Sequence, residues 1–585
     1  MDVQRNFESN VEKRAKDTYG PPPGKKLIVF IDDLNMPKVD VYGTQQPIAL
    51  LKLLLEKGGM YDRGKDLNWK KFQDMVFVAS MGKPGGGRND VDPRFISLFN
   101  VYNITFPSEE SLFLICNSIL EGHLLPFDKE VQGIAPILTR MTMELYHSIV
   151  KDLPPTPSKF HYIFNLRDLS RIYNGLVSTI PERFQTAAQL TRVWRNECLR
   201  VLYDRLIDSQ DRKMVDDKLS QLINDQPLLK PHVEYIFRQP SLYGDYRTAL
   251  DIGEARIYED IQDYDAAKAL FEEILQEYNE QYTRMNLVLF DDALEHLTRI
   301  HRVIRMDKGN ALLVGVGGSG KSSLTRLAAF AAGCEVFEIK LSRGYSEPQF
   351  REDLKVLYNK LGMENKKVVF MFGDQHVAEE GFLELINNIL TTGMVPALFA
   401  DEEREGIVGN IRDEAMKNGA SPAKESIWQY FITKCSVNLH VVLCMSPTGD
   451  TLRTRCRNFP GLINNAIIDW FLPWPEQALY AVSTTLLAED NEFIPKEYRQ
   501  GIVTHMVMVH QSVEHYSEQF AKKLRRHNFT TPKNYLDYLT TYLKLLERKN
   551  KENLAQQQRL AGGLEKIDEA QIQLKDLDAR LQVQR

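Results

Sequence analysis

Residues 315–322 read GVGGSGKS and fit G-x-x-x-x-G-K-S, the pattern of a phosphate-binding loop. An apolar run at residues 311–314 (ALLV) leads into it, and residues 323–329 (SLTRLAA) continue as a helix would. The glycines let the backbone curve around phosphate oxygens, so that N–H groups and a helix N-terminus face the anion. A glycine-rich turn without a ligand is the alternative, and the complete signature in its strand–loop–helix setting favours a nucleotide site.

The loop also supplies two side chains with chemical roles. We expect Lys321 to neutralise the outer phosphates of ATP or ADP, and the hydroxyl of Ser322 to ligate Mg²⁺. The predicted nucleotide contacts in this stretch are Gly315, Gly317, Gly318, Ser319, Gly320, Lys321, Ser322 and Ser323.

Length and composition limit the class of protein. A chain of 585 residues is long enough for several domains, and a net charge of −6 does not suggest a nucleic-acid surface. The six cysteines are scattered without a C-x-x-C pair, so a zinc site or a disulfide framework is not expected. Because no 18-residue apolar run or apolar signal region occurs, we expect a soluble cytosolic chain without a membrane partner.

A second pattern lies near the N-terminus, where residues 25–33 read KKLIVFIDD. An apolar strand that ends in two carboxylates is typical of the Walker B motif. Asp32 would hold Mg²⁺ through water, and Asp33 stands where a base polarises the attacking water. A buried parallel strand followed by a turn is the alternative. No phosphate loop precedes Asp32, so this first module is expected to be N-terminally truncated.

The same pattern recurs after the phosphate loop, at residues 366–375 (KKVVFMFGDQ). Asp374 is placed to hold Mg²⁺, while Gln375 occupies the position of the catalytic carboxylate. An amide can orient water but cannot accept a proton, which predicts tight nucleotide binding with slow or absent hydrolysis. Glu379 or Glu380 could substitute from the following helix.

Polar residues near two other segments complete the predicted site. Ser446 follows the apolar run at residues 439–445 and is placed to sense the γ-phosphate. Arg455 and Arg457 lie in a basic loop that either reaches another module's phosphate or forms a solvated turn. Residues 164–171 (FNLRDLSR) read as a helix start with Asn165 as its cap; Arg167 then faces the nucleotide or solvent.

The character of the chain changes at residue 541, where proline vanishes and glutamine and charge dominate. Apolar residues then recur at intervals of 4, 3, 7, 3 and 4, with Gln571 at one seam position: Leu560, Leu564, Ile567, Leu574, Leu577 and Leu581. This spacing predicts the beginning of a coiled coil. A plain amphipathic surface helix is the alternative.

These motifs together resemble an axonemal dynein heavy chain over essentially all of the sequence. The resemblance rests on residues 31–37 (IDDLNMP), 42–47 (YGTQQP), 85–89 (GGGRN), 161–170 (HYIFNLRDLS), 315–323, 444–447 (CMSP), 459–462 (FPGL) and 468–471 (IDWF). It implies an α/β fold of tandem AAA+ (P-loop NTPase) modules, each a parallel αβα sandwich with a helical small subdomain, ending in a coiled-coil helix.

The resemblance also implies domain limits. The expected parts are the truncated large subdomain of the third AAA+ module at 1–130, its helical small subdomain at 131–280, the large subdomain of the fourth module at 281–480, its small subdomain at 481–540, and the start of the stalk at 541–585.

By the same resemblance, the chain is an ATP-binding segment of a microtubule motor. It would couple nucleotide state to the stalk for minus-end-directed ciliary movement, in the cytoplasm, the cytoskeleton and the cilium axoneme. The implied partners are the remaining ring modules of the same heavy chain, other dynein chains, and microtubules through a stalk tip outside this sequence. The segment alone is expected to bind nucleotide but not to walk. An AAA+ remodelling or scaffold protein that uses ATP as a structural ligand is the alternative; the predicted coiled coil favours the motor.

Two positions depart from the family pattern. The family reads R-F-x-R-H-F-N where residues 94–100 read RFISLFN, so Ser97 replaces the second arginine and Arg94 is the candidate contributor to the preceding site. Asn464 and Asn465 stand where other ring ATPases place the arginine that acts on a neighbour, which leaves Arg455 and Arg457 as the alternatives.

Overall fold

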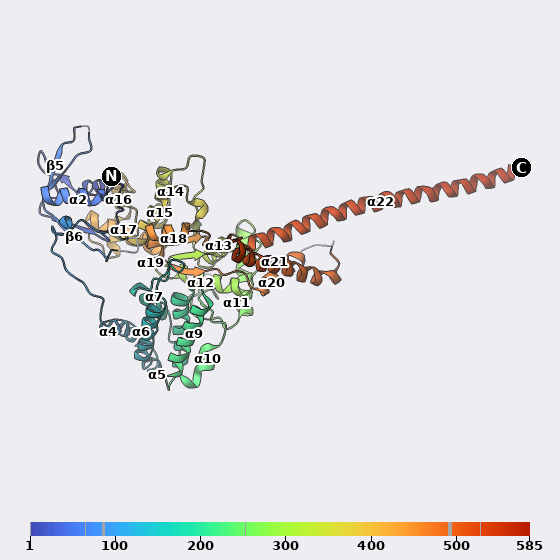
Figure 1. Ribbon diagram of the computed structural model, residues 1–585, viewed down its shortest axis with the longest axis horizontal. Helices are drawn as coiled ribbons and strands as arrows, with labels where there is room; N and C mark the ends of the chain where they lie inside the picture. The colour runs from blue at the N-terminus through green and yellow to red at the C-terminus, as the bar shows by residue number, and fades with distance from the viewer. Residues whose placement is uncertain are drawn as a thin grey trace. The chain divides into compact units, whose positions relative to one another are not determined.

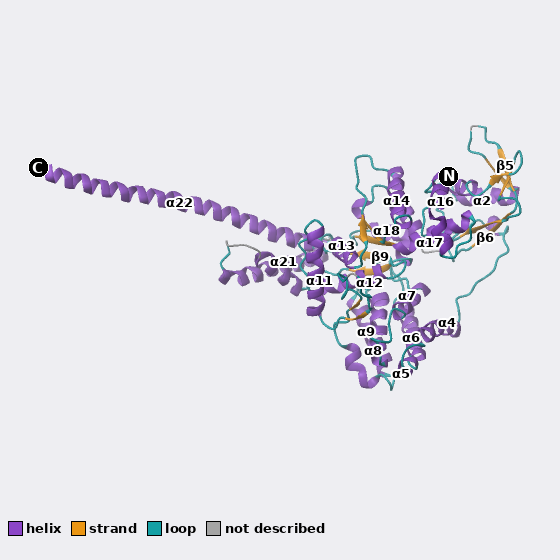
Figure 2. Ribbon diagram, turned by 180° about the vertical axis from the view of Figure 1, so that it is seen from behind, coloured by secondary structure: helices purple, strands orange, loops and turns teal. Residues whose placement is uncertain are grey.

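The computed structural model describes residues 2–64, 66–84, 88–251, 253–488, 494–526 and 528–584. The chain divides into two compact units. Residues 1–260, 299–314 and 328–470 form the first unit, and residues 261–298, 315–327 and 471–585 form the second. The helices and strands are labelled in Figure 1 and coloured by type in Figure 2.

The N-terminal part of the first unit contains two small sheets. A four-stranded sheet has the order β1-β2-β5-β4, and β3 pairs with β6 in parallel. The elements are α1 (Asp2–Glu8), β1 (Glu12–Lys13), β2 (Thr18–Gly20), β3 (Leu27–Ile31), α2 (Gln46–Lys57), β4 (Gly59–Tyr61), β5 (Trp69–Phe72), β6 (Met75–Ala79) and α3 (Pro93–Ile96). The strand predicted within residues 25–33 is therefore confirmed as β3.

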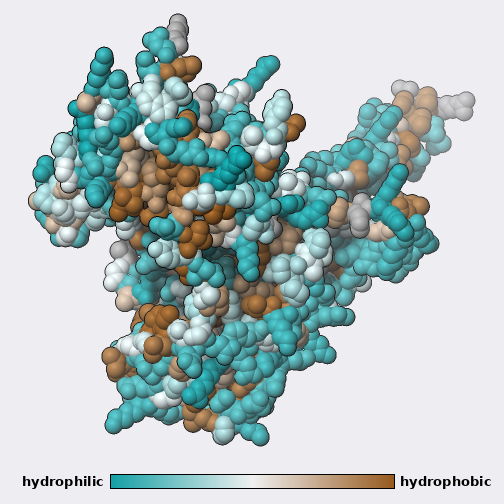
Figure 3. Space-filling view, turned by 60° about the vertical axis from the view of Figure 1, so that its left-hand side comes forward, coloured by the Kyte–Doolittle hydropathy of each residue, from teal (hydrophilic) through white to brown (hydrophobic). Residues whose placement is uncertain are grey.

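Alternate side chains of β3 and β6 are exposed, as the two-residue period of a strand requires. Ile28 and Phe30 are 67% and 63% exposed, and Val76 and Val78 lie on the exposed face of β6. Figure 3 is turned so that the N-terminal part comes forward, and it shows hydrophobic surface gathered on this side.

A helical part follows in the first unit. Its elements are α4 (Glu109–Leu124), α5 (Lys129–Gln132), α6 (Ala135–Asp152), α7 (Leu166–Leu176), α8 (Ala187–Cys198), η1 (Leu199–Tyr203), α9 (Ser209–Asn224), η2 (Lys230–His232), α10 (Val233–Phe237) and the short pair β7 (Tyr243–Gly244) and β8 (Glu259–Asp260). Apolar faces of these helices form one core. Asn165 caps α7 as expected: its Oδ1 accepts from the backbone N of Arg167 at 2.9 Å, and Asp168 Oδ2 accepts from the backbone N of Asn165 at 3.1 Å.

A five-stranded parallel sheet forms the rest of the first unit, in the order β10-β11-β12-β9-β13. Its strands are β9 (Ala311–Val314), β10 (Glu335–Phe337), β11 (Val368–Gly373), β12 (Leu439–Met445) and β13 (Ile467–Trp470). The helices of this part are α14 (Glu347–Gly362), η3 (Asp374–His376), α15 (Gly381–Thr392), α16 (Asp401–Lys417), α17 (Lys424–Asn438), α18 (Thr451–Asn458) and α19 (Gly461–Asn464). Strands β9, β11 and β12 are buried throughout, which explains their unbroken apolar sequences.

Helix α12 (Asp291–Arg305) carries three arginines at intervals of three residues, and each meets a carboxylate of the helical part. Arg299 pairs with Asp204, Arg302 with Glu197 and Arg305 with Asp245. Arg302 and Glu197 are both buried. Because a buried charge that loses its partner is strongly destabilising, these pairs hold residues 299–305 of α12 against the helical part.

The second unit is helical, with α11 (Tyr264–Gln281), α20 (Glu476–Ala488), α21 (Lys496–Leu524), α22 (Pro532–Gln584) and the start of α13 (Lys321–Ala331). Leu479, Val482, Met506, Tyr535 and Leu539 are among its core residues. Helix α22 begins with proline, whose missing N–H needs no partner at a first helical position.

The 53 residues of α22 run well past the core of the second unit (Figure 1). The apolar residues of the predicted seam are all exposed: Leu560, Leu564, Ile567, Leu574, Leu577 and Leu581. The helix is thus confirmed, and its pairing in a coiled coil stays a prediction. Among the described residues, no helix has both the length and the apolarity to cross a membrane.

Candidate nucleotide-binding site

The predicted strand–loop–helix is present. Strand β9 ends at Val314, the loop spans residues 315–320, and α13 begins at Lys321. Gly318 and Gly320 have φ values of 84° and 93°, a backbone conformation that favours glycine. The loop can therefore take its tight curve because these positions lack a Cβ.

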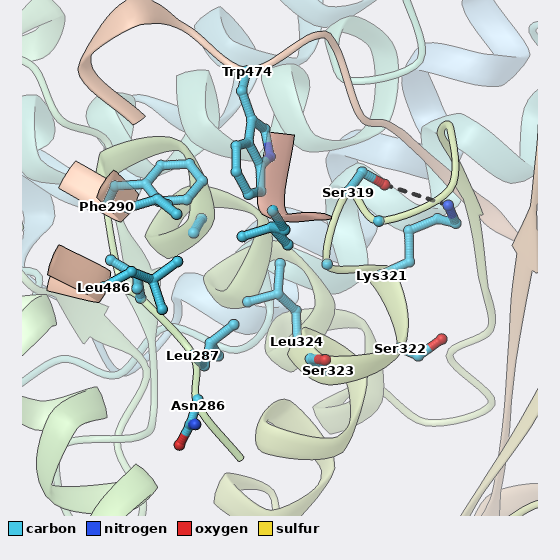
Figure 4. A pocket seen from close by; sticks show the side chains of 16 residues that line it. Asn286, Leu287, Phe290, Ser319, Lys321, Ser322, Ser323, Leu324, Trp474 and Leu486 are labelled. Atoms are coloured by element: carbon cyan, nitrogen blue, oxygen red, sulfur yellow. Dashed lines mark hydrogen bonds between the residues drawn. The ribbon is translucent and has the colours of Figure 1, made fainter. Parts of the chain in front are cut away.

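The ammonium group of Lys321 lies inside the curve of its own loop. Its Nζ donates to the carbonyl oxygens of Gly315 at 2.6 Å and Val316 at 2.9 Å, and to Ser319 Oγ at 3.3 Å (Figure 4). These bonds point the positive charge toward the loop centre, where a phosphate anion would be bound by the loop N–H groups.

A cavity of about 340 Å³ adjoins the loop, and every residue that lines it belongs to the second unit. One side is polar and consists of loop residues, including Ser319, Lys321 and Ser322. The opposite side is apolar: Leu287, Val288, Phe290, Trp474, Val482, Leu486 and Leu536 (Figure 4). An apolar wall beside an anion-binding loop suits a ligand with a flat aromatic base at one end and phosphates at the other.

The loop also touches the first turn of α22. A Cβ added to Gly318 would lie 2.6 Å from both the Cβ and the backbone N of Lys533. Sequence reasoning missed Lys533, although a signal existed. Thr531, which caps the backbone N of Asn534, precedes Lys533 by two residues, as Asn165 precedes Arg167. Both α22 and α7 therefore begin with a capping residue that is followed, two residues later, by a cationic residue.

Asp374 and Ser446, predicted from adjacent strands, are in contact. Asp374 directly follows β11 and Ser446 directly follows β12. The carboxylate of Asp374 accepts from the backbone N of Ser446 at 2.6 Å through Oδ2, and from Arg455 Nη1 at 2.7 Å through Oδ1. Both carboxylate oxygens therefore have a protein partner.

The side chain of Gln375 is exposed and folds back over Gly373, where an added Cβ would lie 2.6 Å from Gln375 Oε1. Of the two glutamates predicted as substitutes, Glu379 is exposed, and Glu380 accepts from Arg455 at 3.2 Å. Arg455 thus bridges Glu380 and Asp374.

One expectation about this region is wrong. Arg455 and Arg457 were expected in a loop, but residues 451–458 form α18. The buried side chains of Leu452 and Cys456 anchor this helix, and their spacing of four residues is the sequence signal for it. Arg457 is exposed on α18, whereas the side chain of Arg455 is 12% exposed.

The first module has its own acid cluster. Asp32 Oδ1 accepts from Ser80 Oγ at 2.5 Å, and Asp33 Oδ1 accepts from Arg88 Nη2 at 2.8 Å. Asp33 has a φ of 47°, which is uncommon for a non-glycine residue and marks a strained position. The neighbouring Gly85, Gly86 and Gly87 lie outside the described residues.

The remaining predicted residues are dispersed over the first unit. Arg94 is exposed on α3, and Arg167 is exposed in the first turn of α7. Arg171 donates to Asp168 Oδ1 at 2.9 Å and to the carbonyl oxygen of Asn464 at 3.0 Å. Burial lowers the pKa of the Arg171 guanidinium, and the charge of Asp168 opposes that shift.

The donor set at Asp374 fits Mg²⁺. No group of three or more His, Cys, Asp or Glu side chains that could hold a metal occurs among the described residues. Mg²⁺ does not need such a group, because it keeps several waters and takes one or two protein oxygens together with phosphate. The side chain of Asp374 is 39% exposed, so it is accessible to a hydrated ion.

A phosphate loop after a buried parallel strand, with an acid at the end of another strand of the same sheet, is the arrangement of a P-loop NTPase. Family models agree. Residues 285–545 match "P-loop containing dynein motor region D4", residues 1–107 match "P-loop containing dynein motor region", and residues 138–225 match "AAA+ lid domain".

Curated relatives give the family. The chain is 65% identical to human "Dynein axonemal heavy chain 10" over 100% of its length, 55% identical to Chlamydomonas reinhardtii "Dynein-1-alpha heavy chain, flagellar inner arm I1 complex" over 99%, and 38% identical to Tripneustes gratilla "Dynein beta chain, ciliary" over 99%. It spans 13% of the length of each. The chain belongs to the axonemal dynein heavy chains, and this membership implies that it binds ATP or ADP.

Proposed function

We propose that the chain is the ATP-binding segment of a dynein motor ring that spans the third module (residues 1–280) and the fourth module (281–540), with residues 541–585 as the start of the stalk. The observation that carries the proposal is the contact between the phosphate loop at Gly318 and the first turn of α22 at Lys533. A ligand bound in the loop would then be separated only by Gly318 from the N-terminal turn of the 53-residue helix α22.

In this proposal, different groups around the cavity bind different parts of the nucleotide. Lys321 would exchange its bonds to the carbonyl oxygens of Gly315 and Val316 for bonds to the outer phosphates. Phe290 and Trp474, whose rings meet edge to face at 5.4 Å between centroids, would contact the base. Ser322 would ligate Mg²⁺, which would neutralise phosphate charge.

Slow turnover is part of the proposal. Gln375 cannot accept a proton from water, and the nearby carboxylate of Glu380 is already paired with Arg455. Gln375 and the paired Glu380 therefore do not supply the base that hydrolysis needs. The fourth-module site would hold ATP as a regulatory ligand.

Coupling to α22 would follow from packing. Tyr535 and Leu539 are buried in the core of the second unit, and the Tyr535 hydroxyl donates to the carbonyl oxygen of Leu479 at 3.2 Å. Phosphate in the loop would fix the first turn of α22, and the rest of the helix would carry that restraint outward. In the complete heavy chain this restraint would reach microtubules through the stalk tip and contribute to minus-end-directed ciliary movement.

The proposed setting follows the names of the relatives, which are axonemal, flagellar and ciliary dynein chains. The chain would act in the cytoskeleton of the cilium axoneme. Its partners would be the other ring modules of the same heavy chain and further dynein chains.

Fluorescent ATP binding and single-turnover hydrolysis on the purified chain test the proposal. We expect micromolar or tighter binding, negligible turnover, and loss of most binding in Lys321→Ala, because the loop then lacks its cation. Rapid hydrolysis that Lys321→Ala abolishes would contradict the regulatory assignment.

A further inference from the structure

A second cavity, of about 450 Å³, lies entirely within the first unit. Its lining comes from the end of α7, the segments next to β7 and β8, and the end of α12. Val177, Ser178 and Asp307 belong to the lining and are exposed, so the cavity is open to solvent. Arg167, the predicted nucleotide contact, lies at the opposite end of the 11-residue helix α7, about 15 Å along its axis. The cavity is therefore separate from that predicted contact.

Three buried polar atoms at this cavity have no hydrogen-bond partner among the described residues: both ring nitrogens of His301, and Asp245 Oδ1. The side chain of His301 is fully buried, and its ring meets that of Tyr246 edge to face at 5.3 Å. His301 Nε2 lies 3.6 Å from Asp245 Oδ1, which is too long for a hydrogen bond. Because buried polar groups in proteins are nearly always hydrogen-bonded, these atoms indicate a polar ligand in the cavity.

The imidazole of His301 is neutral at physiological pH. Burial lowers the pKa of His301 to about 4; the charge of Asp245 opposes that shift, and the charges of Arg305 and Arg256 add to it. A neutral imidazole offers one N–H donor and one acceptor, and Asp245 Oδ1 offers a further acceptor. Hydroxyl groups, which both donate and accept, match this set.

The same cavity contains a cation that a carboxylate does not neutralise directly. Of its three lining arginines, two pair with carboxylates of the helical part. The terminal nitrogens of Arg256 donate instead to the backbone carbonyl oxygens of Ala331 at 2.7 Å and Ala249 at 3.0 Å. A guanidinium has five N–H donors, so three remain for a ligand. Burial, together with the charge of Arg305, lowers the pKa of Arg256, as expected where positive charges gather.

We propose that this cavity binds a small phosphorylated polyol, with its phosphate on Arg256 and its hydroxyls on His301 and Asp245. The fork of a guanidinium matches two oxygens of a phosphate group. Because a water molecule takes up about 30 Å³, the cavity has room for a phosphate together with a short hydroxylated carbon chain. This site does not depend on the phosphate loop at residues 315–322, which belongs to the second unit.

The experiment is a titration of ribose 5-phosphate with the full chain, followed by line broadening of its ³¹P NMR signal. Every variant also carries Lys321→Ala, so that the phosphate loop contributes little to the signal. We expect saturable binding, and a dissociation constant at least about tenfold higher in Arg256→Gln, because charge-assisted hydrogen bonds to the phosphate are lost. Inorganic phosphate, which has no polyol hydroxyls, should bind more weakly than ribose 5-phosphate.

Lys308→Gln is the matched control. It removes an exposed cation one residue beyond the lining residue Asp307, and screening by solvent should keep the dissociation constant within about twofold of the parent chain. Arg256→Lys keeps the charge but not the fork and should give an intermediate value, which provides a second reading if Arg256→Gln is poorly folded. His301→Phe should weaken ribose 5-phosphate more than inorganic phosphate, and His301→Gln, whose amide both donates and accepts, should restore part of the loss.

Three results would overturn the inference. Absence of saturable binding of either compound would mean that water alone fills the cavity. Equal affinities for inorganic phosphate and ribose 5-phosphate would exclude the polyol. Equal effects of Arg256→Gln and Lys308→Gln would reduce the binding to general charge attraction. Each of these results would leave the proposed nucleotide site untouched, since Lys321→Ala is present throughout.

Discussion

Replacing Gly318 by alanine tests the contact between the phosphate loop and α22. The residue has a φ of 84°, where an L-residue costs about 1–2 kcal/mol. The new Cβ would lie 2.6 Å from the Cβ and backbone N of Lys533, so the helix start or the loop must shift, at about 1–3 kcal/mol for overpacking. Together these effects predict a loss of about 2–5 kcal/mol from the free energy of unfolding of the second unit.

The adjacent Gly317 provides the control. A Cβ there meets nothing within 4 Å, and its φ lies outside the left-handed region, so Gly317→Ala should change stability by no more than about 0.5 kcal/mol. For a unit of this size the predicted loss in Gly318→Ala corresponds to a melting temperature lower by roughly 4–20 °C.

Calorimetry, with hydrogen exchange of α22 peptides to assign the transition, measures the difference. Shortening Lys533 to alanine should not rescue Gly318→Ala, because alanine keeps the Cβ and backbone atoms that would be too close. Equal melting temperatures for Gly317→Ala and Gly318→Ala would refute the contact, and with it the proposed path from loop to helix.

Three further outcomes are expected. Leu539→Ala should reduce the free energy of unfolding by about 2–5 kcal/mol, and Leu564→Ala on the same helix by less than about 0.5 kcal/mol, because the former is buried and the latter is 63% exposed; denaturant unfolding checks both. Arg302→Ala should destabilise the first unit by about 3–5 kcal/mol in the same assay, since it leaves Glu197 buried without its partner. Burial lowers the pKa of His161 from 6.5 to about 4, so between these pH values the unfolded chain binds a proton that the folded chain does not. The free energy of unfolding should therefore fall as pH decreases through this window, by up to about 1.4 kcal/mol per pH unit. Urea unfolding across the same pH range should give a smaller slope for His161→Phe.

Local patterns predicted the phosphate loop and the two acid-ended strands. Each depends on a short run of sequence: a buried strand on an unbroken apolar stretch, and the loop on glycines and lysine at fixed spacing. Asn165 was identified as a cap for the same reason, because a cap and its N–H partners are separated by only two or three residues.

Contacts between distant segments were not predicted. The wall of the cavity combines Phe290 and Trp474, which are far apart in the sequence, and neither position carries a motif. Arg455 was recognised as a cation near the site, but its direction depends on how α18 packs, which no local pattern specifies. The contact between Gly318 and Lys533 is likewise set by packing of the second unit.

The most direct test of the central claim is hydrogen exchange of α22 with and without Mg-ATP, in the wild-type chain and in Lys321→Ala. Occupancy of the loop should increase protection at residues 532–546, which include the contact with Gly318 and the buried turns, and should leave residues 560–584 unchanged. Lys321→Ala should show no change at equal ATP. Saturating ATP binding by the wild-type chain without any change at residues 532–546 would contradict the account.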